Sequence, residues 1–351
     1  MKRIYLLILF LPAFVICQIP PGYYNSAQGL TGNNLKVALH NIIKNHTVVA
    51  YSGLWSVFPK SDKKSNGKVW DIYSHVPSGT QPYEYTFVNN QCGTYNSEGD
   101  CYNREHSWPQ SWFNATTGPD SDLFHIYPTD GKVNGQRANF PYGKVGTASW
   151  TSMNGSKLGN CISAGYSATV FEPINEYKGD VARSYFYMTT RYYSEDAAWG
   201  VSDATNKADI LPWQLNLLLQ WHQQDPVSSK EIARNDSIYK VQNNRNPFID
   251  NPAFADSIWS AVVSVFEREI KNVNSYYVYP NPAEDNITIA SSSGSLSSIK
   301  VSVSDVTGRV VSEETILFSE ATIASSQWPA GMYFINVNDG RRVSTLKFVK
   351  L

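Results

Sequence analysis

The pattern of apolar residues changes sharply near Lys271, and this change constrains the fold more than any other feature of the sequence. Beyond it, IKVSVSDVTGRVV and GMYFINVNDGRRVSTLKFVKL alternate apolar and polar residues, with turn signals at Thr307-Gly308 and Asp339-Gly340. Such alternation is typical of half-buried β-strands joined by tight turns. We therefore expect residues from about 275 to the end to form a small all-β sandwich.

The body before this segment carries helical patterns instead. NNLKVALHNIIKNH places Leu35, Leu39, Ile42 and Ile43 on one face, and KGDVARSYFYMTTRYY and PWQLNLLLQWHQQD also predict helices. The chain has 351 residues, of which 42% are hydrophobic and 13% aromatic, so it is long enough for two globular domains. We expect an α+β protein, with a mixed body followed by the small all-β sandwich.

The first seventeen residues have the layout of a secretory signal peptide. Lys2 and Arg3 precede an apolar run from Ile4 to Ile16, and Cys17 stands before the expected cleavage site. The run is too short to span a bilayer, and no other long apolar run follows, so we expect no stable membrane insertion. A lipoprotein anchor at Cys17 is the alternative. The formal net charge of −1 argues against binding nucleic acid through a basic tail, but it leaves room for a local basic groove.

Three cysteines would remain after cleavage. Outside the cytoplasm, Cys92 and Cys101 are expected to close a small loop by a disulfide bond. Cys161 would then be buried and inert, or it would be the true partner of one of the other two. A zinc site built from Cys101, His106 and His125 is a further alternative, although no C-x-x-C spacing supports it.

The stretch YNREHSWPQSWFN places Glu105 and His106 side by side, and DLFHIYPTDGKVNGQRANFPYG follows about twenty residues later. We expect strands near residues 104–107 and 123–127, and then a short helix that carries Asn134. Glu105 and Asn134 would offer oxygen ligands to one divalent cation, Mg²⁺ or Ca²⁺. His106 suits a general base. Adjacent strand residues face opposite ways, so a twist or bulge is expected after Glu105.

Six segments of the body resemble, in order, the endonuclease I family: NREHSWPQSWF, DLFHIYP, VNGQRANFPYG, FEPINEYKGDVARSYFYMTTRY, WHQQDPVSSKEIARND and QNNRNPFIDNP. The likeness covers about residues 51–259. It implies a ββα-metal (His-Me) finger within a catalytic domain of residues 18–271. It also implies a monomeric, non-specific endonuclease that cleaves DNA, and often also RNA, to products with 5′-phosphate ends. By this resemblance His106 is the general base, and Glu105 and Asn134 bind Mg²⁺ (or Ca²⁺ or Mn²⁺).

The sequence departs from the family pattern in two ways. Phe124 replaces the first of two consecutive histidines and His125 keeps the second, so His125 either orients the site or simply packs. The arginine that holds the scissile phosphate has no clear counterpart. The candidates are Arg104, Arg137, Arg183 and Arg245, each of which has a structural ion pair as its alternative role.

The last segment resembles the C-terminal sorting domain of type IX secretion, through YPNPAEDNITI, VSDVTGRVV, AGMYFINV and TLKFVKL. With the signal peptide at 1–17 and the catalytic domain at 18–271 expected above, the resemblance implies a sorting domain at 272–351. It also implies export by the type IX secretion machinery to the medium or the cell surface. An immunoglobulin-like binding or spacer module is the alternative for this segment.

Two other functions fit the same composition. A secreted glycan-binding surface protein would make the Glu105-His106 pair incidental, and a phosphoesterase for small phosphodiesters would use the pair without a preference for polymers. Cleavage of a plasmid with and without EDTA distinguishes a nuclease from a glycan-binding protein. The dependence of activity on salt distinguishes it from a phosphoesterase for small phosphodiesters.

Overall fold

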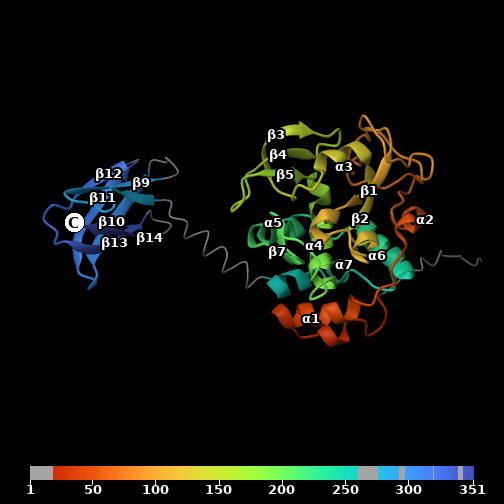
Figure 1. Cartoon of the computed structure of the whole chain (residues 1–351), viewed down its shortest axis with the longest axis horizontal. Coiled ribbons are helices and arrows are strands. Elements are labelled where there is room, and N and C mark those ends of the chain that lie inside the picture. The colour runs from red at the N-terminus through yellow and green to blue at the C-terminus, as the bar shows by residue number, and fades with distance from the viewer. Residues whose placement is uncertain (1–18, 260–275, 292–296, 319, 339–342) are drawn as a thin grey trace, which may run out of the picture. The chain divides into compact units, whose positions relative to one another are not determined.

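The computed structural model describes residues 19–259, 276–291, 297–318, 320–338 and 343–351. The chain divides into two compact units, Met1–Ser264 and Val265–Leu351 (Figure 1). The expected signal peptide and the expected boundary at residues 271 and 272 lie outside the described residues.

A buried helix, α4 (Lys178–Arg191), forms the centre of the first unit. All 14 of its residues are buried, as expected for a helix that is covered on every side. It contacts α5 (Pro212–Gln224), α1 (Gly32–Ile43) and α7 (Pro247–Asp250) (Figure 1). The three helices predicted from the sequence are therefore confirmed.

The first unit contains other helical elements besides these. They are α2 (Leu54–Ser61), α6 (Ser229–Gln242) and the 3₁₀ turns η1 (Asn25–Ala27), η2 (Tyr51–Gly53), η3 (Gln110–Phe113), η4 (Pro119–Ser121) and η5 (Asn175–Tyr177). Residues 253–259 are also helical. Helix α6 begins with a capping box, in which the Ser228 side chain accepts from the Glu231 N–H and Glu231 accepts from the Ser228 N–H.

Two antiparallel strands and a helix carry the candidate residues. Strand β1 (Tyr102–His106) pairs with β2 (Ile126–Asp130) in a continuous register that sets His106 opposite Ile126. Helix α3 (Gly131–Arg137) follows β2 at once, and Asp130 caps it by accepting a hydrogen bond from the Val133 N–H at 2.8 Å. The other sheets of the unit join β3 (Val145–Thr151), β4 (Lys157–Cys161) and β5 (Thr169–Glu172), and β6 (Thr205–Asn206) with β7 (Asp209–Ile210).

The second strand begins three residues later than the sequence pattern suggested. Residues 123–125 form a turn in which the His125 N–H donates to the Asp122 carbonyl oxygen. Arg234 fixes this turn, because its Nη2 donates to the carbonyl oxygens of Leu123 and Ile126. This long-range contact overrides the local strand preference of the apolar residues, so His125 precedes the strand instead of lying on it.

The second unit is all-β, as expected. One sheet has the order β11-β10-β13-β14 and the other β12-β9-β8. Ile287, Ile289, Val301, Val303 and Phe348 belong to the apolar core of the unit. The strands are β8 (Tyr276–Tyr279), β9 (Asn286–Ser291), β10 (Ser297–Asp305), β11 (Val310–Phe318), β12 (Glu320–Ala324), β13 (Gly331–Asn338) and β14 (Val343–Lys350).

Of the two turn signals in this unit, one is described. Gly308 has a φ of +86°, and its N–H donates to the Asp305 carbonyl oxygen, so the Thr307-Gly308 turn is confirmed. The Asp339-Gly340 signal lies outside the described residues. Within the described part of the chain, no helix has the length and apolarity needed to cross a membrane.

Candidate active site

The candidate residues of β1 alternate between two environments. Asn103 and Glu105 contact α3, whereas Arg104 and His106 contact Tyr51 of η2. The pairing of β1 with β2 is continuous from Glu105 to His106, so of the twist or bulge expected there, the bulge is absent. Since His106 is the last residue of the strand, both side chains nevertheless lie at the same end of the sheet.

Glu105 is buried, with 1% of its surface exposed, and its recorded hydrogen bonds converge on one oxygen. Oε1 accepts from the Tyr73 hydroxyl at 2.8 Å, from Arg137 Nη1 at 2.9 Å and from the Tyr142 hydroxyl at 3.4 Å. Burial raises the pKa of Glu105 above its usual range, and Arg137 and the two hydroxyls oppose this increase. The donors thus stabilise the charged carboxylate and fix its orientation.

Arg137 ties α3 to the end of β1. Besides Glu105, its guanidinium donates to the carbonyl oxygens of His106, at 2.7 Å, and Ser107, at 2.6 Å. It also stacks on the Tyr142 ring, 4.5 Å from the centroid. Only 1% of Arg137 is exposed, so this geometry favours a positioning role over contact with a phosphate.

Asn134 lies one turn before Arg137 on α3. Its Nδ2 donates to Asn103 Oδ1 at 2.7 Å and to the Arg104 carbonyl oxygen at 3.3 Å. These bonds orient the carboxamide and leave its oxygen, Oδ1, as the atom available for another partner. A carboxylate and a carboxamide oxygen are ligands that hard divalent cations accept, so the donor set fits such a cation.

His106 is oriented by a hydrogen bond from its Nε2 atom. Nε2 lies 3.0 Å from the Asp120 carbonyl oxygen, which only accepts hydrogen bonds, so Nε2 carries the proton and Nδ1 keeps a lone pair. The ring stacks on Tyr51, with 5.8 Å between centroids, and contacts Phe113. Burial, reinforced by neighbouring positive groups, lowers the pKa of His106 to about 3, so the imidazole is neutral.

His125 lies behind His106, 5.5 Å from it between ring centroids. It is completely buried, and its Nε2 donates to the Pro119 carbonyl oxygen at 2.6 Å. The η4 turn therefore presents two successive carbonyl oxygens, of Pro119 and Asp120, to the two histidines. Gly118 starts this turn with a φ of +105°, a conformation that favours glycine. In the sequence, the triplet GPD is the local feature that indicates this turn.

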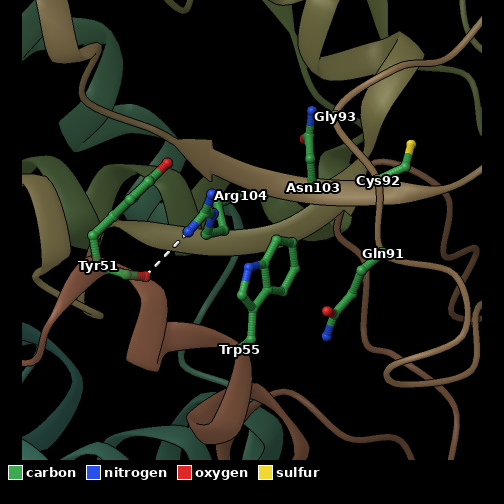
Figure 2. Close-up of a pocket in the computed structure, with 7 residues that line it drawn as sticks. All are labelled: Tyr51, Trp55, Gln91, Cys92, Gly93, Asn103 and Arg104. Atoms are coloured by element: carbon green, nitrogen blue, oxygen red, sulfur yellow. Dashed lines mark hydrogen bonds between the residues drawn. The ribbon is translucent and has the colours of Figure 1, made fainter.

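The four arginine candidates differ in accessibility. Arg183 and Arg245 are buried in ion pairs with Glu231 and Asp250, and Arg137 is buried as described above. Arg104 is partly exposed, and its guanidinium lies over the rings of Tyr51, at 3.7 Å, and Trp55, at 4.7 Å (Figure 2). Arg104 is thus the candidate best placed to meet a phosphate.

The cysteines pair as expected. Cys92 and Cys101 form a disulfide bond, and Cys161 is buried without one. Because its sulfur is in the disulfide, Cys101 is not a zinc ligand, and the alternative zinc site with His106 and His125 is wrong. Among the residues that the structure describes, no group of three His, Cys, Asp or Glu side chains is arranged to hold a metal ion.

No sequence motif marks the tyrosines around the site. Tyr51, Tyr73 and Tyr142 come from segments well separated from β1 along the chain, and each contacts Glu105, Arg104 or His106. The chain has 22 tyrosines, so residue type alone does not single these out. Only the tertiary fold brings them to β1.

Comparison with known families divides the chain as the structure does. The family model described as Endonuclease I matches residues 31–253. The model described as Secretion system C-terminal sorting domain matches residues 277–351. The first match includes β1, β2 and α3, and the second includes most of the all-β unit.

Similar proteins include several secreted nucleases. An extracellular ribonuclease of Bacillus subtilis is 36% identical over 68% of this chain and 78% of its own length. An extracellular ribonuclease of Bacillus amyloliquefaciens is 37% identical with the same coverage. An extracellular deoxyribonuclease of Aeromonas hydrophila is 30% identical over 37% of this chain and 49% of its own length.

Proposed function

Since the chain belongs to the endonuclease I family and carries a secretion sorting domain, we propose that it is a secreted, metal-dependent endonuclease that hydrolyses DNA and RNA. The relatives named as ribonucleases and deoxyribonucleases support both polymers as substrates. They also favour a nuclease over a glycan-binding protein. The sorting domain supports export by the type IX secretion machinery.

His106 is the general base in this proposal. A single observation carries this assignment: the Nε2–H bond to the Asp120 carbonyl oxygen, which leaves Nδ1 able to take a proton from the attacking water. A neutral imidazole is required for this step, and burial keeps His106 neutral. Through the η4 turn and ring contact, His125 positions His106 and takes no proton itself.

Glu105 and Asn134 would hold the divalent cation, in what we interpret as a ββα-metal finger made of β1, β2 and α3. When bound, the cation supplies positive charge to the scissile phosphate and the leaving oxygen. Tyr73, Tyr142 and Arg137 fix the carboxylate of Glu105, while Asn103 orients the carboxamide of Asn134. Mg²⁺ is our first choice because it accepts few protein oxygens and keeps several waters, and Ca²⁺ and Mn²⁺ are alternatives.

Arg104 is the phosphate-binding residue in this proposal. It lies on the same face of β1 as His106, two residues earlier, and its guanidinium is the partly exposed one among the candidates. Tyr51 stacks on both side chains and so fixes their spacing. A planar guanidinium suits a phosphate because it offers two parallel hydrogen bonds.

Incubation of the purified protein with plasmid DNA and with ribosomal RNA tests the function. We expect cleavage of both at millimolar Mg²⁺, complete loss in EDTA and recovery on adding Mg²⁺ back. Activity should fall steeply with salt as the backbone contacts are screened. A small phosphodiester should be hydrolysed poorly. An active protein in EDTA, or one equally active on the small ester, would contradict the proposal.

A further inference from the structure

A pocket beside β1 begins at Arg104, Tyr51 and Asn103 of the proposed site and extends to residues that have no role in the chemistry described so far. It has a volume of about 390 Å³, and among the residues that line it are Tyr51, Trp55, Gln91, Cys92, Gly93 and Arg104 (Figure 2). Ligand pockets typically run from about 300 to 1,000 Å³, so this one suits a single small ligand.

The walls of the pocket are fixed by hydrogen bonds and a disulfide. The segment around Gln91 runs beside the start of β1, where the Cys92 N–H donates to the Tyr102 carbonyl oxygen at 3.1 Å. The Tyr102 N–H donates in turn to the Asn90 carbonyl oxygen at 2.8 Å, and Cys92 is bonded to Cys101. The pocket is therefore formed before any ligand arrives.

The chemistry of the lining suits an aromatic, polar ligand. Trp55 is partly exposed and offers an aromatic surface, while Gln91, also partly exposed, offers amide donors and an acceptor. Figure 2 shows Trp55 between Arg104 and Gln91. The residues that line the pocket include no carboxylate, so nothing there repels a phosphate attached to the ligand. A nucleobase with its phosphate has this combination of properties.

The pocket lies close to His106 along β1, because Arg104 lines it. Arg104 lines the pocket and lies two residues before His106 on β1, about 6.6 Å along an extended strand. Neighbouring nucleotides of one strand of a duplex are about 3.4 Å apart along its axis, so this separation corresponds to about two such steps. A base in the pocket would belong to a nucleotide beside the scissile phosphate.

We propose that this pocket is a nucleobase subsite for an unpaired base adjacent to the cleaved bond, with Trp55 as the stacking platform and Gln91 reading the base edge. The inference rests on the proposed nuclease function and extends it to specificity. A duplex keeps its bases stacked and paired, so the pocket can bind a base only from a single strand or from a locally opened duplex. It gives the enzyme a preference for single-stranded substrate and for the base at one flanking position.

The test compares a single-stranded oligonucleotide with its own duplex. Stacking of one base is worth a factor on the order of 10 to 100 in binding, so Trp55→Ala should lower kcat/KM on the single strand by about this factor. Its effect on the duplex should be only a few-fold. Trp55→Phe should restore most of the single-strand rate. The matched control is Trp150→Ala, which removes a partly exposed tryptophan of β3 that does not line the pocket.

Because Trp55 also contacts Arg104, Trp55→Ala has a general effect on both substrates, and the ratio of the two rates is the informative quantity. An equal loss on both substrates, or no loss on either, would overturn the subsite. Gln91→Ala leaves Arg104 in place and gives a second readout. Sequencing the cut ends of a random single strand should show a base preference for the wild type that this variant flattens. Unchanged preferences would also count against the proposal.

Failure of the nuclease function would be visible separately, as a wild type that cleaves neither substrate. The pocket is then tested by equilibrium binding of adenosine 5′-monophosphate and, as a control without a base, ribose 5-phosphate. We expect the nucleotide to bind at least about 10-fold more tightly than the sugar phosphate, and Trp55→Ala to abolish the difference. Equal binding of the two ligands by the wild type would overturn the subsite whatever the catalytic activity.

Discussion

Replacing Arg137 with methionine should destabilise the protein strongly, and by an amount that depends on pH. The change removes the buried positive partner of Glu105, 2.9 Å away, and the donors to the His106 and Ser107 carbonyl oxygens. Breaking a buried ion pair by removing one partner costs about 3–5 kcal/mol. A domain has only about 5–15 kcal/mol of total stability, so the loss is large.

The pH dependence follows from the pKa of Glu105, which burial already raises above its usual range while Arg137 opposes the increase. Without Arg137 the folded-state pKa rises further, so the folded protein binds a proton that the unfolded chain has released. Below its pKa in the unfolded chain, a carboxyl group of this kind does not lower the free energy of unfolding. Above that pKa it destabilises the fold progressively, until the pH reaches its pKa in the folded protein. The deficit of Arg137→Met should therefore be smaller near about pH 5 than near about pH 8.

Urea denaturation followed by tryptophan fluorescence, in EDTA to exclude metal, measures this deficit. Of the ten tryptophans, only Trp328 lies outside the first unit, so the signal reports mainly on that unit. Adding Glu105→Gln to Arg137→Met removes the unpaired charge and should recover part of the lost stability, most clearly at high pH. A deficit that is the same at both pH values, or no recovery in the double variant, would refute the role assigned to this pair.

Three further predictions concern the cation, the phosphate and export. Glu105→Gln should weaken Mg²⁺ binding measured by calorimetry, whereas Asn134→Asp should preserve or strengthen it. Both variants should lose turnover because the charge balance at the phosphate changes. If both variants bound Mg²⁺ and cleaved like the wild type, the cation would have to bind elsewhere. Arg104→Ala should weaken binding to every sequence and reduce the slope of log K against log salt by about 1, and an unchanged slope would contradict a phosphate contact. Deleting residues 272–351 should leave an active nuclease that fails to reach the medium of the native host, and an inactive or insoluble product would show that the two units depend on each other.

Much of the architecture was predictable because it depends on local patterns. The alternating segments after residue 275 form the all-β unit, and the period of Leu35, Leu39 and Ile43 gives α1. Asp130 is a favourable helix cap in the sequence, and α3 begins directly after it. Features of this kind need information from only a few neighbouring residues.

The site was harder to predict because it is assembled over long distances. The start of β2 is shifted by Arg234, which is more than a hundred residues away in sequence. The charge state of Glu105 depends on Tyr73, Tyr142 and Arg137, none of which a local motif marks as its partner. Strand alternation already indicated that Glu105 and His106 face opposite ways, but only the fold shows which side chains surround each of them.

The most direct test of the account is the cleavage rate of His106→Ala. Loss of a general base costs roughly 10²–10⁴-fold in rate, and because the variant retains Glu105 and Asn134, its Mg²⁺ affinity should stay near that of the wild type. Added imidazole should restore part of the rate. The control is His40→Ala, which removes a buried histidine of α1 whose Nδ1 bonds to the carbonyl oxygens of Thr190 and Arg191. We predict a large loss of rate for His106→Ala and a small one for His40→Ala, and cleavage by His106→Ala within a few-fold of wild type would contradict the assignment of His106 as the general base.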